Sequence, residues 1–135
     1  WYQDTSGQRR CLDHTTIIPA PFAGTVVQII DDFLGQSIFL PQSAGKADGR
    51  RLLFALGHTT PRQGLAVGQT IPAGDILAEL ATPARGSVPP HLHLTLALIP
   101  DSLPPTLLTW DYLGTSPDIT LLDPLAVFPT TVALV

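Results

Sequence analysis

The sequence lacks several features that mark large classes of protein. It has one cysteine, Cys11, one lysine, Lys46, and no methionine, and only 13% of its residues are charged. A single cysteine cannot form an internal disulfide, so the cysteine count gives no support for secretion. No apolar run approaches the roughly 20 residues that cross a bilayer, because proline, glycine or charge interrupts every stretch. We therefore expect no membrane span in this chain.

Positive charge is also scarce. The formal net charge is −4, and adjacent basic residues occur only at Arg9–Arg10 and Arg50–Arg51. This balance argues against nucleic acid as the main partner. At 135 residues the chain fits one domain, which we expect to comprise a core over residues 14–100 and a proline-spaced tail over residues 101–135. Because the chain begins at Trp1, we expect further residues upstream.

Proline and glycine are abundant and divide the chain into short runs. Fourteen prolines and eleven glycines separate segments rich in Val, Ile, Leu, Thr and Phe. This pattern is typical of many short strands joined by turns, and no window has the apolar period of a helix. The sequence therefore predicts an all-β fold. The expected strands are Thr15–Ile18, Gly24–Asp31, Gln36–Leu40, Arg51–Leu56, Ile76–Ala81 and His91–Ile99.

Two of the four histidines are one residue apart. In the segment from His91 to Leu96, His91, His93 and Thr95 alternate with Leu92, Leu94 and Leu96. Alternation with period two predicts a half-buried strand with both imidazoles on one face. The alternative is a pair of polar side chains on the solvent face of an edge strand. A polar loop over residues 82–90 leads into this pair, and loops that feed a rigid strand often carry sites.

Three segments resemble one family. Residues 20–27, APFAGTVV, resemble a strand entry of the form APxxGTVV, and residues 67–77, VGQTIPAGDIL, resemble the turn VGQxVxxGxxI. Both are common to barrel-sandwich folds. Residues 90–94, PHLHL, are similar to the PHLHFE strand of the lysostaphin-type (LytM-like) zinc endopeptidases. His58 ends a segment similar to the LYxH motif of that family, two positions later than usual.

The resemblance implies a fold, a cofactor and roles for three histidines. The fold is an antiparallel barrel-sandwich, the duplicated hybrid motif. His93 is implied as a zinc ligand, and His91 and His58 as the catalytic pair that acts on the water or on the tetrahedral intermediate. A neutral imidazole binds zinc, and one that titrates near neutrality moves a proton.

The remaining zinc ligands of the family are not matched. They lie in an HxxxD motif upstream of the APxxG strand, where this chain has only His14, followed four positions later by Ile18. Ile18 cannot bind a metal. A second metal ligand at His14, a carboxylate from Asp4 or Asp13, and a ligand upstream of Trp1 all remain open, as does a structural or solvated role for His14.

Three functions follow from these residues. The first is a zinc-dependent endopeptidase that cuts cell-wall peptides. The second is a degenerate LytM-like domain that binds peptidoglycan, or a partner cell-wall hydrolase, without metal. The family implies an extracellular or cell-envelope location for both.

The third is a carrier or phosphotransfer domain on the same architecture. Lys46 lacks the usual flanking residues of a carrier lysine, and residues 56–60 only weakly resemble a phosphocarrier histidine motif.

Other residues invite simpler interpretations. Cys11 more often fills an apolar gap than acts as a nucleophile. We expect Asp31–Asp32 to be a solvated turn pair, and His58 is as easily an ordinary loop histidine as a catalytic one.

Overall fold

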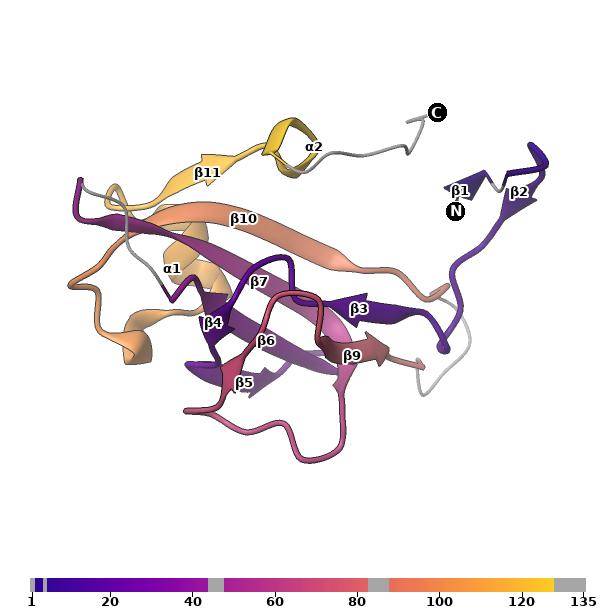
Figure 1. The fold of residues 1–135 in the computed structure, drawn as a ribbon, viewed down its shortest axis with the longest axis horizontal. Helices are drawn as coiled ribbons and strands as arrows, with labels where there is room; N and C mark the ends of the chain where they lie inside the picture. Colours follow the sequence, from indigo (N-terminus) through magenta and orange to yellow (C-terminus); the bar gives the residue numbers. More distant parts are fainter. Residues whose placement is uncertain (1, 4, 44–47, 83–87, 128–135) are drawn as a thin grey trace.

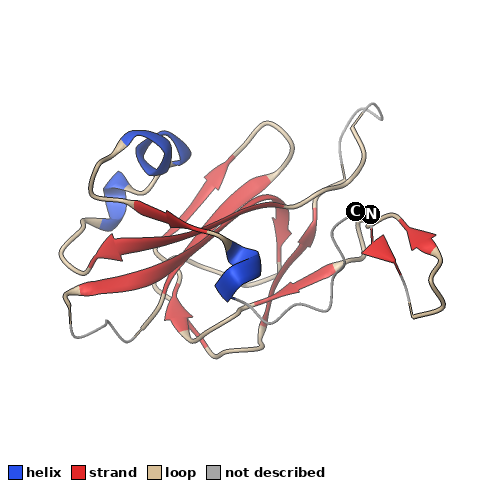
Figure 2. Ribbon diagram, turned by 90° about the horizontal axis from the view of Figure 1, so that it is seen from above, coloured by secondary structure: helices blue, strands red, loops and turns tan. Residues whose placement is uncertain are grey.

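Strands dominate the fold. The computed structural model describes residues 2–3, 5–43, 48–82 and 88–127. Strands account for 42% of the structure and helices for 11%, and all strand pairs are antiparallel. The predicted all-β class is therefore confirmed, and the sheets formed by the described residues do not close into a barrel. Figure 2 shows the helices as short segments in a structure made mostly of strands and loops.

One seven-stranded sheet forms the centre of the molecule. Its main path runs β11–β10–β7–β6–β5. The bounds are β5 Gln28–Asp31, β6 Gln36–Pro41, β7 Arg50–Pro61, β10 His93–Pro100 and β11 Thr120–Leu122. The long strands β7 and β10 lie side by side across the whole sheet (Figure 1).

The sheet branches near the end of β7. Pairing between β7 and β10 stops at Gly57 opposite His93. From Thr59 onward β7 pairs instead with β9 (Ile76–Leu80), which in turn pairs with β3 (Ile17–Pro19). Since Thr59 also pairs with Gln36 of β6, strand β9 takes the side of β7 that β10 has left. His58 lies at this change of partner.

Four shorter strands complete the β structure. Strands β1 (Tyr2–Gln3) and β2 (Arg9–Arg10) form one small sheet, and β4 (Gly24–Thr25) and β8 (Thr70–Ile71) form another. The single strand predicted over residues 24–31 is thus divided into β4 and β5. Between them, the backbone N–H of Val26 donates to the carbonyl of Gln69, and its carbonyl accepts from the N–H of Gly68. The side chain of Val26 is fully buried.

The segment after residue 100 is more regular than a tail. It contains η1 (Pro105–Leu107), α1 (Trp110–Thr115) and α2 (Pro124–Val127), and β11 extends the sheet beside β10. Part of this segment packs against the sheet, since Leu103, Leu108 and Leu113 belong to the same buried cluster as residues of β6, β7 and β10. None of the helices in the described part of the chain is long and apolar enough to span a membrane.

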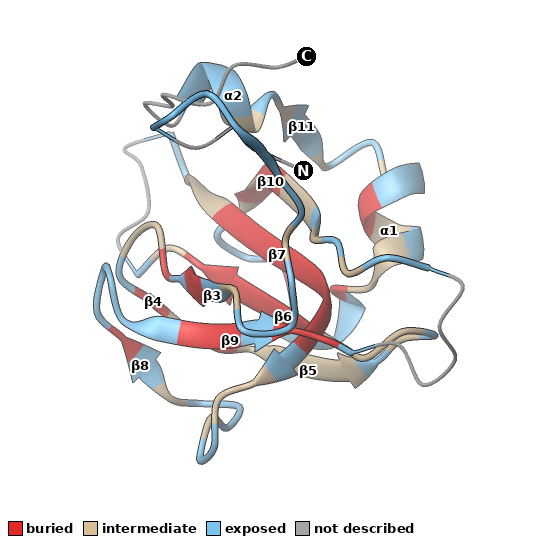
Figure 3. Cartoon of the chain, turned by 90° about the vertical axis from the view of Figure 1, so that its right-hand side faces the viewer, coloured by how far each residue is buried: buried red, intermediate tan, exposed pale blue. Residues whose placement is uncertain are grey.

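Apolar side chains cover both faces of the central strands. Within β6, Ile38 and Leu40 join one buried cluster and Phe39 joins the other, and β7 divides its residues in the same way. Successive side chains of a strand point to opposite faces, so each strand contributes to two cores. Figure 3 shows the buried residues concentrated in β6, β7 and β10. The sheet is a rigid support for whatever lies at its branch.

Candidate functional site

Three of the four histidines meet at the branch of the sheet. The ring of His58 lies 4.9 Å from that of His91 and 5.7 Å from that of His93, measured between centroids. His58 is buried, whereas His91 and His93 are exposed. Strand β10 begins at His93 rather than at the predicted His91, and it lies between β7 and β11. Because β11 pairs only with Leu96–Leu98, the start of β10 at His93 has β7 as its single partner, and the alternative of an edge strand stays open for the histidine pair.

The fourth histidine lies elsewhere. His14 is exposed in the turn that precedes β3. Among the described residues, neither a ring contact nor a hydrogen bond joins it to the other three histidines. The structure therefore groups His58, His91 and His93, which we call the histidine cluster, and leaves His14 outside it.

A β-bulge orients His58. Gln36 pairs with Thr59 and Ile38 with Leu56, so β7 uses three residues where β6 uses two. The extra residue bends the strand, and bulges commonly redirect a side chain at a site. His58 has φ 63°, which is unusual for a residue with a side chain and costs about 1–3 kcal/mol. The bulge explains why β7 continues past Leu56, its predicted end, although apolar and polar residues do not alternate regularly there.

The carboxylate of Asp32 holds His58 in this conformation. It accepts hydrogen bonds from the backbone N–H of His58 at 2.9 Å and from its Nδ1 at 3.0 Å. It also accepts from the backbone N–H groups of Leu34 and Gly35 and from the hydroxyl of Ser37. The side chains of Asp32 and His58 are each 9% exposed. The expectation of a solvated turn pair is therefore wrong for Asp32, although Asp31 is exposed.

Hydrogen bonding keeps Asp32 ionised. Burial by itself would raise the pKa of this carboxyl group, but the hydrogen bonds from His58, Ser37 and Leu34 together outweigh burial and hold its pKa well below the ordinary value. A charged acceptor at Nδ1 also fixes the tautomer of neutral His58. Its proton is on Nδ1, and the lone pair is on Nε2.

The same network extends to the other side of the cluster. The hydroxyl of Ser37 donates to Asp32 at 2.7 Å and accepts from Nε1 of Trp110 at 2.8 Å. The indole of Trp110 is stacked on His93, with centroids 4.3 Å apart and planes 15° apart. Ser37 therefore connects two histidines of the cluster. It contacts the carboxylate of Asp32, which holds His58, and the indole of Trp110, which stacks on His93.

Gly57 permits this close packing. A Cβ at this position would lie 3.0 Å from Cζ2 of Trp110 and 3.2 Å from Cβ of His93. Both neighbours belong to packed elements, so neither gives way easily. A residue without a side chain is needed where β7, β10 and α1 meet.

His91 is fixed through its backbone surroundings. Its Nδ1 lies 3.0 Å from the carbonyl oxygen of Pro89, which can only accept, so Nδ1 carries the proton. Nε2 of neutral His91 is then an acceptor, like Nε2 of His58. Within the described residues neither Nε2 atom has a hydrogen-bond partner. The cluster therefore offers two ring acceptors to an incoming N–H donor.

His93 resists protonation. Although His93 is exposed overall, partial desolvation of its ring is the main reason that its pKa lies below the ordinary value, and the nearby His58 and His91 lower it further, against the opposing effect of the Asp32 carboxylate. Neutral His93 keeps a flat, uncharged face against the indole of Trp110. The part of the cluster that contacts α1 is therefore uncharged.

A cleft adjoins the cluster on that side. It has a volume of 190 Å³, and its lining residues are His93, Thr95, Trp110, Leu113, Gly114 and Leu121. On the opposite side Phe33 is 84% exposed and packs edge-on against His58, with centroids 5.0 Å apart. The cleft is smaller than the roughly 300–1,000 Å³ typical of small-molecule sites, so it has room for one small apolar side chain beside the fixed polar groups.

The donor set of the described residues does not form a zinc site with three protein ligands. No three His, Cys, Asp or Glu side chains in the described residues are arranged to hold a metal ion. Asp13 is exposed and accepts from the backbone and hydroxyl of Thr15, hydrogen bonds that lower its pKa. Cys11 is an exposed free thiol. Asp4, Lys46 and Trp1 lie outside the described residues, as do residues 83–87 of the loop before the histidine pair.

Neither a protein-family model nor a curated protein matches this sequence. The relation to LytM-like domains therefore stays an inference from the three motifs.

Sequence reasoning missed three residues of the site, Asp32, Phe33 and Ser37. The sequence predicts Asp32 only as half of a solvated turn pair and Ser37 only as part of a strand, and it gives no signal for Phe33. The segment Asp32–Phe33–Leu34–Gly35 did contain a signal, since an aspartate three residues before a glycine commonly accepts hydrogen bonds from the turn that it begins. Nothing local in the sequence reveals that the same carboxylate also binds His58.

Proposed function

We propose that this chain is a LytM-like domain that binds cell-wall peptides at the histidine cluster without a metal ion. One observation carries the proposal: the three histidines of the cluster are held in place, but the set of metal ligands is incomplete. His58, His91 and His93 are held by Asp32, Pro89 and Trp110, yet neither these nor any other three His, Cys, Asp or Glu side chains of the described residues are arranged to hold a metal ion. Such an ordered cluster can serve as a recognition surface without a metal ion.

The cluster has suitable chemistry for a peptide. Nε2 of His58 and Nε2 of His91 accept from peptide N–H groups, and the cleft between Trp110 and Leu121 takes a small apolar side chain. The rings are fixed before the ligand arrives, so little side-chain freedom is lost on binding. Ordered acceptors and an apolar cleft together favour short peptides with alternating small side chains.

Calorimetric titration with soluble peptidoglycan fragments tests the proposal. We expect saturable binding that His91→Ala and His93→Ala each weaken by about tenfold or more, since each removes a contact to the peptide. His14→Ala is the matched control and should bind as the wild type does. Equal binding by all three variants would contradict a site at the cluster. If the fragments do not bind while a cell-wall amidase does, the partner is the enzyme rather than the wall.

Zinc-dependent cleavage is the second candidate function. It is favoured by the position of His58 beside both His91 and His93, which is the grouping that the family resemblance implies for an enzyme. Incubation of peptidoglycan fragments with the full chain and excess zinc, followed by mass spectrometry, separates the two candidates. New fragments that disappear in His93→Ala would establish cleavage, and intact fragments support binding alone.

A further inference from the structure

The start of β10 has an open edge beside the histidine cluster. β7 pairs with one side of β10 along its whole length, whereas on the other side β11 pairs only with Leu96, Ala97 and Leu98. Residues 93–95 therefore have a single neighbouring strand within the described ranges. An unpaired strand edge presents backbone N–H and C=O groups to any chain that is added beside it.

The pairing of the central strands shows which backbone groups point to this edge. In an antiparallel sheet, the N–H and C=O groups of successive residues point to opposite neighbours. The N–H of Gln42 donates to the carbonyl of Leu52, so the backbone groups of Leu52 point to β6 and those of Ala55, an odd number of residues later, point to β10. Ala55 pairs there with Thr95. The backbone groups of Thr95 therefore point to β7, and those of Leu94 point to the open edge.

Pro124 explains why β11 does not cover Leu94. The register that pairs Leu122 with Leu96 would bring Pro124 opposite Leu94. Proline has no N–H to donate to the carbonyl of Leu94, and for this reason it is rarely found inside a paired strand. The chain instead passes from the end of β11 into α2, a short helix with no buried residue (Figure 1). In the described part of the chain, no backbone hydrogen bond joins Leu94 to a residue on this side.

A strand added at this edge would reach the apolar cleft. Residues that face each other across antiparallel strands have their side chains on the same face of the sheet. A residue opposite Thr95 would therefore place its side chain beside Trp110 and Leu121, in the cleft of 190 Å³. The next residue of the added strand would exchange two hydrogen bonds with Leu94. The edge and the cleft can thus bind one chain together.

We infer that an extended peptide of α-linked residues binds as an added strand at Leu94, antiparallel to β10 and in line with β11. Antiparallel pairing suits so short an edge, because one peptide residue then uses both backbone groups of Leu94. The inference rests on the proposed binding of peptides at the histidine cluster, and it names the class of peptide. The ligand has consecutive ordinary peptide bonds and a small apolar side chain opposite Thr95.

A second copy of this chain is a poorer occupant of the edge. Only residues 93–95 of β10 lack a partner beside β11 in the described structure. Three residues bury far less than the roughly 1,000 Å² that a stable interface between proteins needs. A short peptide needs only these residues and the cleft.

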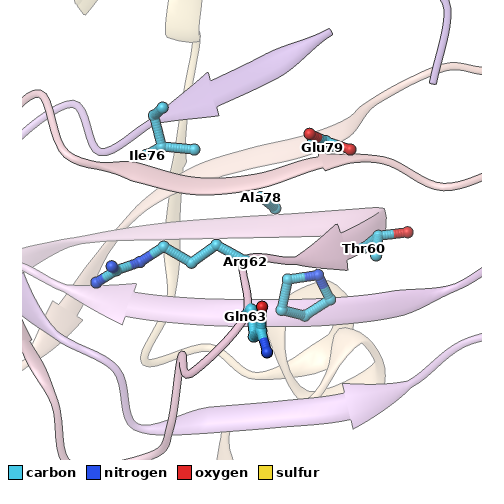
Figure 4. Close-up of a pocket in the computed structure, with 7 residues that line it drawn as sticks. Thr60, Arg62, Gln63, Ile76, Ala78 and Glu79 are labelled. Carbon is cyan, nitrogen blue, oxygen red and sulfur yellow. The ribbon is translucent and has the colours of Figure 1, made fainter. Parts of the chain in front are cut away.

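Amide hydrogen exchange, measured by NMR on the full chain with and without acetyl-pentaalanine amide, tests this inference. We expect the amide of Leu94 to exchange at least about tenfold more slowly with saturating peptide, because its N–H then donates to the peptide. Gln63 is the control outside the site. It is exposed at a separate pocket between β7 and β9, shown in Figure 4, and its amide should exchange equally fast in both states.

Two variants separate the backbone contact from the leucine side chain. Leu94→Ala keeps the N–H and should bind the peptide within about threefold of the wild type, whereas Leu94→Pro lacks it and should bind at least about tenfold more weakly. Because β7 does not use this N–H, proline is compatible with the strand, and circular dichroism checks folding. The exchange measurement on the wild type decides by itself if Leu94→Pro does not fold.

The outcomes distinguish this inference from the proposed function. Binding of the peptide without slower exchange at Leu94 overturns the added strand and leaves peptide binding at the cluster standing. Binding of peptidoglycan fragments but not of acetyl-pentaalanine amide has the same meaning. If neither the fragments nor the peptide binds, both the inference and the proposed function are overturned.

Discussion

A single carboxylate organises the histidine cluster. Asp32 accepts hydrogen bonds from Leu34, Gly35, Ser37 and, twice, from His58. These partners come from the turn before β6, from β6 itself and from β7. Since His58 lies in the left-handed region of backbone space, this carboxylate also offsets the cost of that conformation. We therefore expect Asp32 to matter for both stability and pH dependence.

Asp32→Asn should destabilise the fold by about 1–3 kcal/mol, because the buried N–H and hydroxyl donors lose a charged acceptor. The folded state depresses the pKa of Asp32, so its contribution is present above the unfolded value, near 4, and is lost as pH falls below it. Urea denaturation from pH 7 to pH 3 should therefore show a smaller loss of stability for Asp32→Asn than for the wild type.

The neighbouring aspartate is the matched control for this substitution. Asp31 is exposed and accepts only from the side chain of Gln36 in the described structure. Asp31→Asn should change the free energy of unfolding by less than about 0.5 kcal/mol and leave its pH dependence intact. Identical pH profiles for the wild type and Asp32→Asn would contradict the assigned role of the buried carboxylate.

At this scale, sequence reasoning predicted the histidines but not their supports. His91 and His93 could be found because alternation with leucine is a local pattern. His58 was selected by a motif. Asp32 could not be connected to His58, because the two residues are 26 positions apart and only the pairing of β6 with β7 brings them together.

Among the elements, α1 has the largest influence on the site. Its first residue, Trp110, both donates to Ser37 and stacks on His93, and Leu113 anchors it in the core. The helix begins at a cap in which the hydroxyl of Thr109 accepts from the backbone N–H of Tyr112 at 3.1 Å. With six residues it is too short for helical periodicity to appear in the sequence.

Thr109→Ala should cost about 1 kcal/mol, the usual value for loss of such a cap. It should also shift the indole N–H resonance of Trp110, because the start of the helix positions this ring. Urea denaturation and NMR measure the two effects. Thr115→Ala is the control at the other end of α1. Its hydroxyl donates only to the carbonyl of Asp111 in the same helix, so we expect no loss of stability. Equal losses in both variants would contradict the cap.

Strand prediction succeeded where alternation was regular and failed where the chain changed direction. β6 and β9 lie within one residue of their expected bounds. β7 extends to Pro61 because the bulge at Gly57 and His58 interrupts the alternation without ending the strand. β11 was missed because its three residues form a strand only beside β10.

At the scale of the whole molecule, the proposed metal-free function predicts that a metal ion adds little stability. Two buried clusters lie on opposite faces of the central strands and are made of aliphatic and aromatic side chains. The melting temperature should therefore stay within about 3 °C when a chelator or excess zinc is added, since a larger shift would correspond to roughly 1 kcal/mol of binding. Scanning calorimetry measures this. A zinc-induced increase well above that value, absent in His93→Ala, would contradict the metal-free interpretation.

The branch in the sheet has a consequence for protein engineering. The backbone of β7 pairs with β10 up to Gly57 and with β9 from Thr59, on either side of His58. This arrangement is made by backbone hydrogen bonds, so it does not depend on the side chains exposed beside it. His91, which is exposed and lies outside the strands, can therefore be exchanged for other functional groups with little risk to folding. A domain of this kind is a scaffold in which the pairing of β7 with β10 and with β9 is kept while the functional groups around it are changed.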